Sequence, residues 1–144
     1  MSAALSLLKP AVAESLAIWH DGVARRDLAR LPEIVHPDAV FRSPMAHTAY
    51  GPAPALILVL GTVLQVFENF TYHREFASED GLNVVLEFSA TIGDRKLKGI
   101  DMIRFDESGK ILDFEVMVRP FSGLQALGTE MGKRLGHLLP GYKA

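Results

Sequence analysis

The sequence predicts an α+β fold in which helices come first and an antiparallel sheet follows. Apolar residues recur at helical spacing near the start of the chain, at Val12, Leu16, Trp19 and Val23. From residue 71 onward, apolar and polar residues alternate, as they do along strands with one buried face. Only short turns join these alternating segments, and a parallel pair would need a long crossover. Helices and strands are therefore segregated, which is typical of an α+β domain.

Three helical segments are expected before the sheet. The first covers about residues 10–26 and begins at Pro10, a residue suited to a first helical turn. A shorter piece over 28–35 follows, and His36 is expected at its end. The third segment, over about 55–68, is apolar on most sides and is expected to be buried. It is too short to span a bilayer, which needs about 20 residues.

One strand is expected between the helices, over 39–43, followed by a loop over 45–54. Four more strands are expected in a consecutive run, at 71–77, 82–90, 97–105 and 112–119. A final helix is expected over 122–139, although its four glycines weaken it. We expect residues 1–144 to form one domain, with a core at about 10–120 and a C-terminal helical extension.

Composition narrows the classes of partner. Of 144 residues, 15 are Lys or Arg and 17 are Asp or Glu, without long runs of one sign, so nucleic acid is not an expected partner. The chain has no cysteine, and its five histidines lack metal-binding spacing, so we expect neither a metal nor a cofactor. The apolar N-terminus has no basic residues ahead of it, which favours a cytoplasmic protein without a membrane anchor.

Asp101 is the most informative single residue. Alternation places it on the inward face of its strand with Leu97, Gly99, Ile103 and Phe105. A carboxylate without a partner is expensive to bury, so this acid either carries a proton or has a donor close by. Such an acid marks a pocket, or else it only forms a hydrogen bond within the core, for example with Trp19 or Tyr50.

A set of short motifs occurs in a consistent order along residues 10 to 120. They are Trp19, Arg26-Asp27-Leu28, the run from His36 to Pro44, Tyr50-Gly51, and Ile100 to Asp106 running into Gly109-Lys110-Ile111. With them the chain resembles the nuclear transport factor 2-like superfamily, which includes ketosteroid isomerases and polyketide cyclase-like proteins. The resemblance implies a cone-like fold, in which a curved mixed or antiparallel sheet wraps around the N-terminal helices and opens into an apolar pocket. It also implies a homodimer paired through the outer sheet face.

The resemblance assigns roles to three positions. Asp101 matches the protonated acid that donates to the oxyanion in ketosteroid isomerases. Trp19 falls where those enzymes have a tyrosine, and Ser43 falls where they have the aspartate base. An indole N–H still donates a hydrogen bond, but an unaided serine hydroxyl does not abstract a proton near neutral pH. The ketosteroid isomerase mechanism is therefore not expected in this chain.

Two functions remain open. The first is an enzyme that acts on an apolar, oxygen-bearing small molecule by isomerisation, cyclisation, dehydration or hydrolysis. Asp101 would donate or shuttle a proton, and His47 or Tyr50 would assist from the loop. The alternative for His47 is an ordinary solvated loop histidine. The second is a non-catalytic homodimeric module that binds a ligand or a protein in the same cone. The residues expected to bind the ligand are Trp19, Phe41, Ser43, Phe88, Ile103 and Val116.

The outer face of the sheet is expected to be only partly polar. Glu87 and Lys98 lie on the outer sides of neighbouring strands and are expected to form an ion pair, among the apolar side chains of Val85, Met102 and Met117. A partly apolar outer face favours a partner sheet, so we expect a homodimer through this face.

Overall fold

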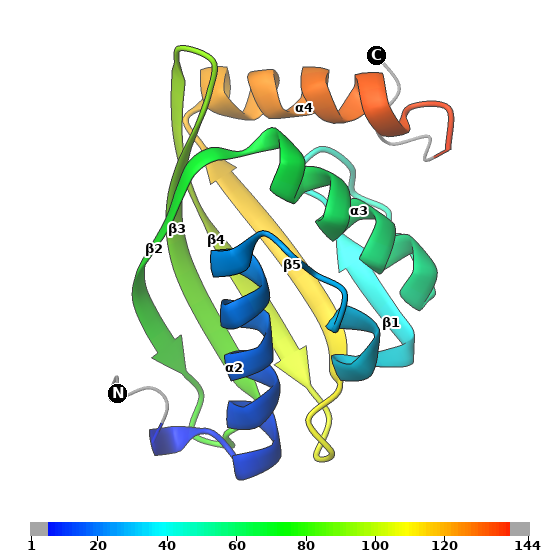
Figure 1. Cartoon of the computed structure of the whole chain (residues 1–144), viewed down its shortest axis with the longest axis vertical. Coiled ribbons are helices and arrows are strands. Elements are labelled where there is room, and N and C mark those ends of the chain that lie inside the picture. Colours follow the sequence, from blue (N-terminus) through cyan, green and yellow to red (C-terminus); the bar gives the residue numbers. More distant parts are fainter. Residues whose placement is uncertain (1–5, 139–144) are drawn as a thin grey trace.

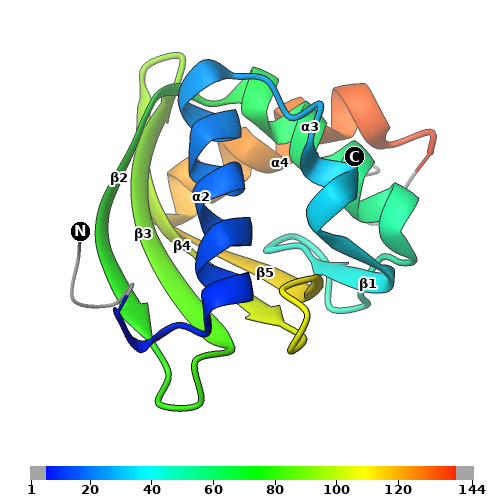
Figure 2. The same cartoon turned by 60° about the horizontal axis from the view of Figure 1, so that its bottom comes forward.

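The computed structural model describes residues 6–138 and shows one five-stranded sheet with three α-helices. The sheet bends around helix α2 (Pro10–Arg25), which lies against its concave face (Figure 1, Figure 2). Helix α3 (Ala53–Val66) lies near the edge of the sheet, and helix α4 (Phe121–Leu135) crosses one end of the fold. The α+β architecture predicted from the sequence is confirmed. No helix among residues 6–138 is long and apolar enough to cross a membrane.

The strand order is β1-β5-β4-β3-β2, and the sheet is mixed. Strands β2 (Glu68–Ala77), β3 (Asn83–Ile92), β4 (Arg95–Phe105) and β5 (Ile111–Arg119) pair antiparallel in sequence order. Strand β1 (Val35–Arg42) instead pairs parallel with β5 at the edge. The long connection through α3 and three strands makes this parallel pair possible, because parallel strands need a crossover.

The segment before β1 corrects a sequence expectation. The expected helical piece over 28–35 shrinks to one 3-10 turn, η1 (Leu31–Ile34), and β1 begins at Val35. His36 is therefore part of a strand, and the prediction that it ends a helix is wrong. Its Nδ1 accepts a hydrogen bond from the Asp38 backbone N–H at 3.0 Å. An edge strand tolerates Pro37, which has no N–H to donate, and the register shifts at this point.

Arg26 ties the first helix to the third. Its φ of 53° ends α2 in a left-handed turn. The guanidinium then donates to the Leu64 carbonyl at 2.6 Å and to the Phe67 carbonyl at 3.4 Å. These carbonyls lie at the C-terminal end of α3, where backbone acceptors lack helical partners and a positive charge is favourable. The contact fixes α3 over the sheet, and α3 forms one wall of the pocket described below.

The alternation expected along β4 is confirmed. Its inward residues are all buried, and Lys98, Met102 and Arg104 on the other side are exposed. The inward side chains pack with α2, α3 and α4 into one apolar core. The expected ion pair is also present, with Lys98 Nζ 3.0 Å from a Glu87 carboxylate oxygen. Arg74 joins the same carboxylate from β2, at 2.6 Å.

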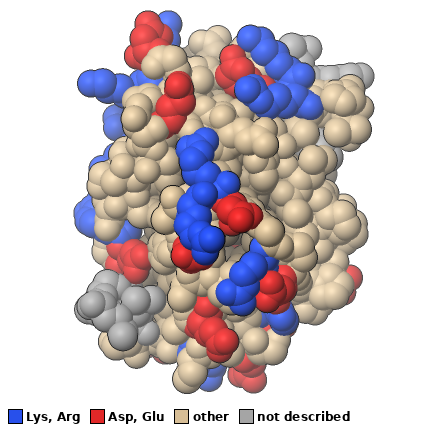
Figure 3. All heavy atoms as spheres, in the orientation of Figure 1, with Lys and Arg blue, Asp and Glu red and all other residues tan. Residues whose placement is uncertain are grey.

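Charges of both signs are mixed over the surface. On the face shown in Figure 3, basic side chains lie beside acidic ones. Local pairs such as Arg25–Asp21 at 3.4 Å and Arg30–Glu33 at 3.2 Å contribute to this mixing. A nucleic-acid site would need a basic stripe, and this face carries none. The expectation that nucleic acid is not a partner stays a prediction.

Candidate functional site

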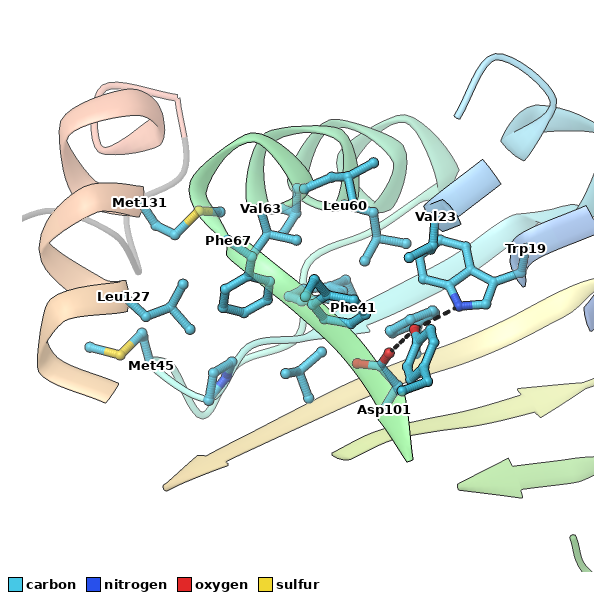
Figure 4. Close-up of a pocket in the computed structure, with 17 residues that line it drawn as sticks. Trp19, Val23, Phe41, Met45, Leu60, Val63, Phe67, Asp101, Leu127 and Met131 are labelled. Carbon is cyan, nitrogen blue, oxygen red and sulfur yellow. Dashed lines mark hydrogen bonds between the residues drawn. The ribbon is translucent and has the colours of Figure 1, made fainter. Parts of the chain in front are cut away.

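The concave face of the sheet and the three helices enclose an apolar pocket. Helix α2 contributes Trp19 and Val23 to its lining, and α4 contributes Leu127 and Met131. The wall from α3 consists of Val59, Leu60, Val63 and Leu64. Aromatic rings from the strands and from the residue that follows α3 also line it, namely Phe41, Phe67, Phe70 and Phe114. Figure 4 shows these side chains converging on a hollow, with Asp101 at one end.

Asp101 enters this pocket from the middle of β4. It lies opposite Leu86 of β3 and Val116 of β5, so both of its neighbours across the sheet are apolar. The residue is only 6% exposed. Such burial penalises the charged form of a carboxyl group unless a cation or several donors compensate.

A directional chain of hydrogen bonds ends at this carboxyl group. Trp19 Nε1 donates to the Tyr72 hydroxyl at 2.9 Å, and the Tyr72 hydroxyl donates to Asp101 Oδ2 at 2.6 Å. Dashed lines in Figure 4 trace the chain, and the other Asp101 oxygen points away from it into the pocket. Because each group donates to the next, the bonds polarise one another in one direction. The Trp19 N–H and the Tyr72 O–H each already have an acceptor within the protein, whereas the second Asp101 oxygen points into the pocket.

Burial raises the pKa of Asp101 to about 7, and the hydrogen bond from Tyr72 partly offsets this by lowering it. Burial also raises the pKa of Tyr72 well above its ordinary value, and the nearby Asp101 charge adds to the effect. Tyr72 therefore stays a neutral donor at physiological pH. The Asp101 carboxyl group is about half protonated near neutrality, which is the condition under which a side chain best gives and takes protons.

The structure brings some of the expected site residues together. Asp101, Trp19, Phe41 and Val116 all line the pocket. Phe88 and Ile103 are fully buried but do not reach the lining. The Phe88 ring packs behind Phe70 and Phe67, with centroids 5.0 and 5.5 Å away. Phe88 thus supports the aromatic wall from outside the pocket.

The expected loop residues lie outside the lining. The Ser43 hydroxyl accepts the Met45 backbone N–H at 2.9 Å, which is turn chemistry. His47 is exposed in the loop between β1 and α3. Tyr50 exchanges backbone hydrogen bonds with Phe41, at 2.7 and 2.8 Å, and so fastens this loop to β1. The roles expected for these three residues stay predictions.

Tyr72 is the site residue that sequence reasoning missed. It lies on β2, opposite Phe88 of β3, and is half-buried. The sequence signal that could have found it is the alternation of side chains along the strand. Phe70 and Tyr72 are two residues apart, so they share a face, and that face is the inward one. A tyrosine at an inward position usually has a hydrogen-bond partner when buried, and the inward acid on β4 was the candidate. The direct partner of Asp101 is therefore Tyr72, with Trp19 one bond further away.

Acid–base capacity is concentrated at one end of the pocket. Among the lining residues in the described part of the chain, only Asp101 and Tyr72 titrate. Residues 6–138 contain no cluster of three or more His, Asp or Glu side chains that could hold a metal ion. The arrangement presents one carboxyl group to an apolar hollow, and this group can give an oxygen atom placed beside it a hydrogen bond or a proton.

Comparison with known proteins agrees with this geometry. The family model of the SnoaL-like domain matches residues 17–114. No curated protein matches the chain. A structure named a steroid delta-isomerase from Pseudomonas aeruginosa is 64% identical, covers 92% of this chain and 97% of its own, and has a TM-score of 0.88.

Two further structures extend the comparison. A Silicibacter pomeroyi protein with a cystatin-like fold is 31% identical over 84% of each chain, with a TM-score of 0.78. A putative SnoaL-like polyketide cyclase from Jannaschia sp. CCS1 is 11% identical, with a TM-score of 0.67 over 83% of this chain and 93% of its own, and shows the shared fold alone. The chain thus belongs to the SnoaL-like domain family of the nuclear transport factor 2-like superfamily.

Proposed function

We propose that the chain is an enzyme that rearranges an apolar, carbonyl-bearing small molecule, by isomerisation or cyclisation, with Asp101 as the pocket acid. One observation carries the proposal: a buried carboxyl group with a pKa of about 7 ends a hydrogen-bond chain inside an apolar pocket. A residue perturbed by burial in a cleft is a functional-site candidate on physical grounds. The apolar lining favours a ligand with little polar surface besides the atom that meets Asp101.

The protonated carboxyl group would donate to the carbonyl oxygen of the substrate. This hydrogen bond strengthens as negative charge develops on that oxygen, so it stabilises the transition state more than the substrate. A neutral carboxylic acid in an apolar site is a suitable donor for this purpose. Tyr72 holds Oδ2 and keeps the other oxygen directed into the pocket.

A rearrangement suits a pocket with one acid. Substrate and product contain the same atoms, so the reaction consumes no proton overall. Asp101 would keep its proton and share it with the carbonyl oxygen in a hydrogen bond, while water at the pocket mouth would take the proton from the carbon next to the carbonyl group and return it to the carbon two positions further on. The carboxyl group then ends the reaction in its starting state. The 64% identical protein is named a steroid delta-isomerase, and this supports an isomerase more than a hydrolase or a dehydratase.

A second candidate, a non-catalytic ligand-binding module, has one observation in its favour. Ser43 stands where a carboxylate base was sought, and its hydroxyl is engaged with the Met45 backbone outside the pocket. A protein that only binds a ketone would need the donor at Asp101 but no base. The two candidates differ in turnover and agree on the ligand class.

The test is turnover of a β,γ-unsaturated ketone to its conjugated isomer, followed by ultraviolet absorbance of the product. Wild-type protein should convert the ketone, and kcat/KM should fall as pH rises through about 7, because the protonated form is the active one. Asp94→Asn serves as the control, since Asp94 is 97% exposed in a turn far from the pocket. Binding of the ketone without any conversion would favour the binding module, and a lack of binding would overturn both candidates.

We also propose that two copies pair through their outer sheet faces. Phe76, Met102 and Met117 are exposed there, at 53%, 37% and 44%. Charges of both signs flank these apolar side chains, with Glu115 beside Arg42 at one end of the face and Lys98 beside Glu87 at the other. A two-fold axis through the exposed apolar side chains would set the same patch of both copies together, as an isologous dimer requires. Sedimentation should show a dimer at micromolar concentration that Met117→Lys dissociates, and a wild-type monomer would contradict the pairing.

A further inference from the structure

The pocket is narrow for the ligand class just proposed. Its free interior is about 40 Å³, inside an indentation of about 560 Å³ that includes the open mouth. A cavity needs roughly 10–15 Å³ to hold one water molecule, whereas sites for small organic ligands span about 300–1,000 Å³. Entry of an apolar molecule therefore requires a lining side chain to move.

Met45 is the lining side chain best able to move. It is 38% exposed, whereas the other lining side chains are buried or half-buried. Its backbone N–H donates to the Ser43 hydroxyl at 2.9 Å, and its side chain takes no part in that bond. A methionine side chain has three rotatable bonds and a polarisable sulfur, and it repacks at little cost.

The tip of Met45 rests on a glycine of α4. A Cβ placed on Gly128 would lie 2.4 Å from the Met45 methyl carbon and 3.0 Å from its sulfur. The tip therefore occupies the space that a side chain at position 128 would fill. Glycine inside a helix costs roughly 0.5–1 kcal/mol relative to alanine. The packing of the Met45 tip explains why position 128 is nevertheless a glycine. Figure 4 shows Met45 beside Leu127, at the end of the pocket away from Asp101.

We propose that Met45 is the gate of the pocket and that its seat on Gly128 sets the size of substrate admitted. The substrate would place its carbonyl oxygen at Asp101, and its apolar end would displace the Met45 tip from α4. This inference rests on the function proposed above and specifies the substrate further. The substrate is a ketone whose apolar part is long enough to extend from Asp101 to α4. A small ketone requires only a slight displacement of the Met45 tip, whereas a large one requires the tip to leave its seat.

Trp19 provides a direct readout, because it is the single tryptophan of the chain and it lines the pocket. The probes are cyclohexanone and cyclododecanone, which share one carbonyl group and differ in bulk, with cyclohexane and cyclododecane as hydrocarbon counterparts. Met45→Ala should raise the affinity for cyclododecanone about tenfold, the scale of one or two methylene groups of displaced contact. The affinity for cyclohexanone should rise much less, because the smaller ring displaces the Met45 tip less.

Gly128→Ala tests the seat independently. The added methyl group evicts the Met45 tip, so this variant should alter cyclododecanone affinity when Met45 is present and have no effect in the Met45→Ala background. Gly61→Ala is the matched control, since it also adds a methyl group to a helix but meets nothing within 4 Å. Equal effects of Gly128→Ala in both backgrounds would overturn the seat, and unchanged cyclododecanone affinity in Met45→Ala would overturn the gate.

Failure of the gate can be told from failure of the proposed function. Asp101→Leu should weaken the binding of both ketones and leave that of both hydrocarbons nearly unchanged, because leucine has no hydrogen-bond donor and only the ketones use one. If Asp101→Leu changes the binding of neither ketone, the placement of the carbonyl at Asp101 is overturned, whatever Met45→Ala does. If no probe changes Trp19 fluorescence in any variant, both inferences are overturned.

Discussion

Two buried acids on neighbouring strands of the same sheet behave in opposite ways. Asp101 of β4 and Glu87 of β3 are each 6% exposed. The pKa of Asp101 is raised to about 7, whereas that of Glu87 is lowered to about 2. Equal exposure thus accompanies opposite shifts of pKa, and the cause lies in what surrounds each carboxyl group.

Glu87 lies on the outer face and has two cations as partners. Hydrogen bonds from Arg74 and Lys98 lower its pKa and outweigh the opposing effect of burial. Both cations stay largely exposed, at 68% and 48%, and they reach over the carboxylate from β2 and β4. Asp101 lies on the inner face and has one neutral partner, Tyr72, among apolar side chains. A carboxyl group that keeps its proton near neutrality requires burial without a nearby cation.

The largest expected effect is on turnover, when the carboxyl group of Asp101 on the inner face is replaced. Asp101→Asn keeps the size of the side chain and removes its acidic proton, so turnover of the β,γ-unsaturated ketone should fall about a hundredfold or more. Glu87→Gln is the matched outer-face change and should leave turnover unaltered, because Glu87 does not line the pocket. Steady-state kinetics of the two variants would contradict the comparison if they lost activity equally.

The next effect concerns stability against pH. The pKa of Asp101 is raised in the folded chain, so the folded state holds a proton that the unfolded state releases above about pH 4. Its contribution to stability is fully present below that pH and is lost as pH rises through about 7. The full loss is about 4 kcal/mol, and Asp101→Asn should abolish it. Chemical denaturation of both proteins between about pH 4 and about pH 8 measures the difference.

Glu87 should show the opposite sign in the same measurement. Its pKa is lowered in the folded chain, so its contribution is present above the unfolded value and is lost as pH falls toward about 2. Glu87→Gln should therefore reduce the loss of unfolding free energy at acidic pH. The loss that Asp101 causes as pH rises toward about 7 should stay unchanged. If Glu87→Gln instead changed the pH dependence of stability near neutral pH, the two acids would be coupled through the sheet.

This contrast also explains how far the sequence could predict the site. Period-two alternation was sufficient to place Asp101 inward and Glu87 and Lys98 outward, because a strand has only two faces. It could not pair Tyr72 with Asp101, since that contact depends on β2 curving toward α2 with register shifts along the way. It also missed Arg74 as the second cation of Glu87, and the pocket walls from α3 and α4, which depend on how helices are placed over the sheet.

A smaller effect is expected from removing the neutral partner of Asp101. The Tyr72 hydrogen bond lowers the pKa of Asp101, so Tyr72→Phe should move the midpoint of the pH–activity profile upward. The phenyl ring keeps the aromatic wall, and a hydrogen bond to an ionised group is worth about 1.5–3 kcal/mol. Trp19→Phe acts one bond further from the acid, so its shift should have the same sign and be smaller. A downward shift in either variant would contradict the direction of the chain.

The smallest effect should follow from weakening the outer cations one at a time. Lys98→Met keeps the aliphatic stem, and Arg74 still pairs with Glu87 at 2.6 Å. Loss of one exposed ion pair costs about 1 kcal/mol or less and depends on salt. The midpoint of the pH–activity profile, which reports the pKa of Asp101, should not move, because no cation on the outer face reaches the inner carboxyl group. If Lys98→Met did move this midpoint, the field of the outer face would contribute to the acid in the pocket, and apolar burial alone would not explain its raised pKa.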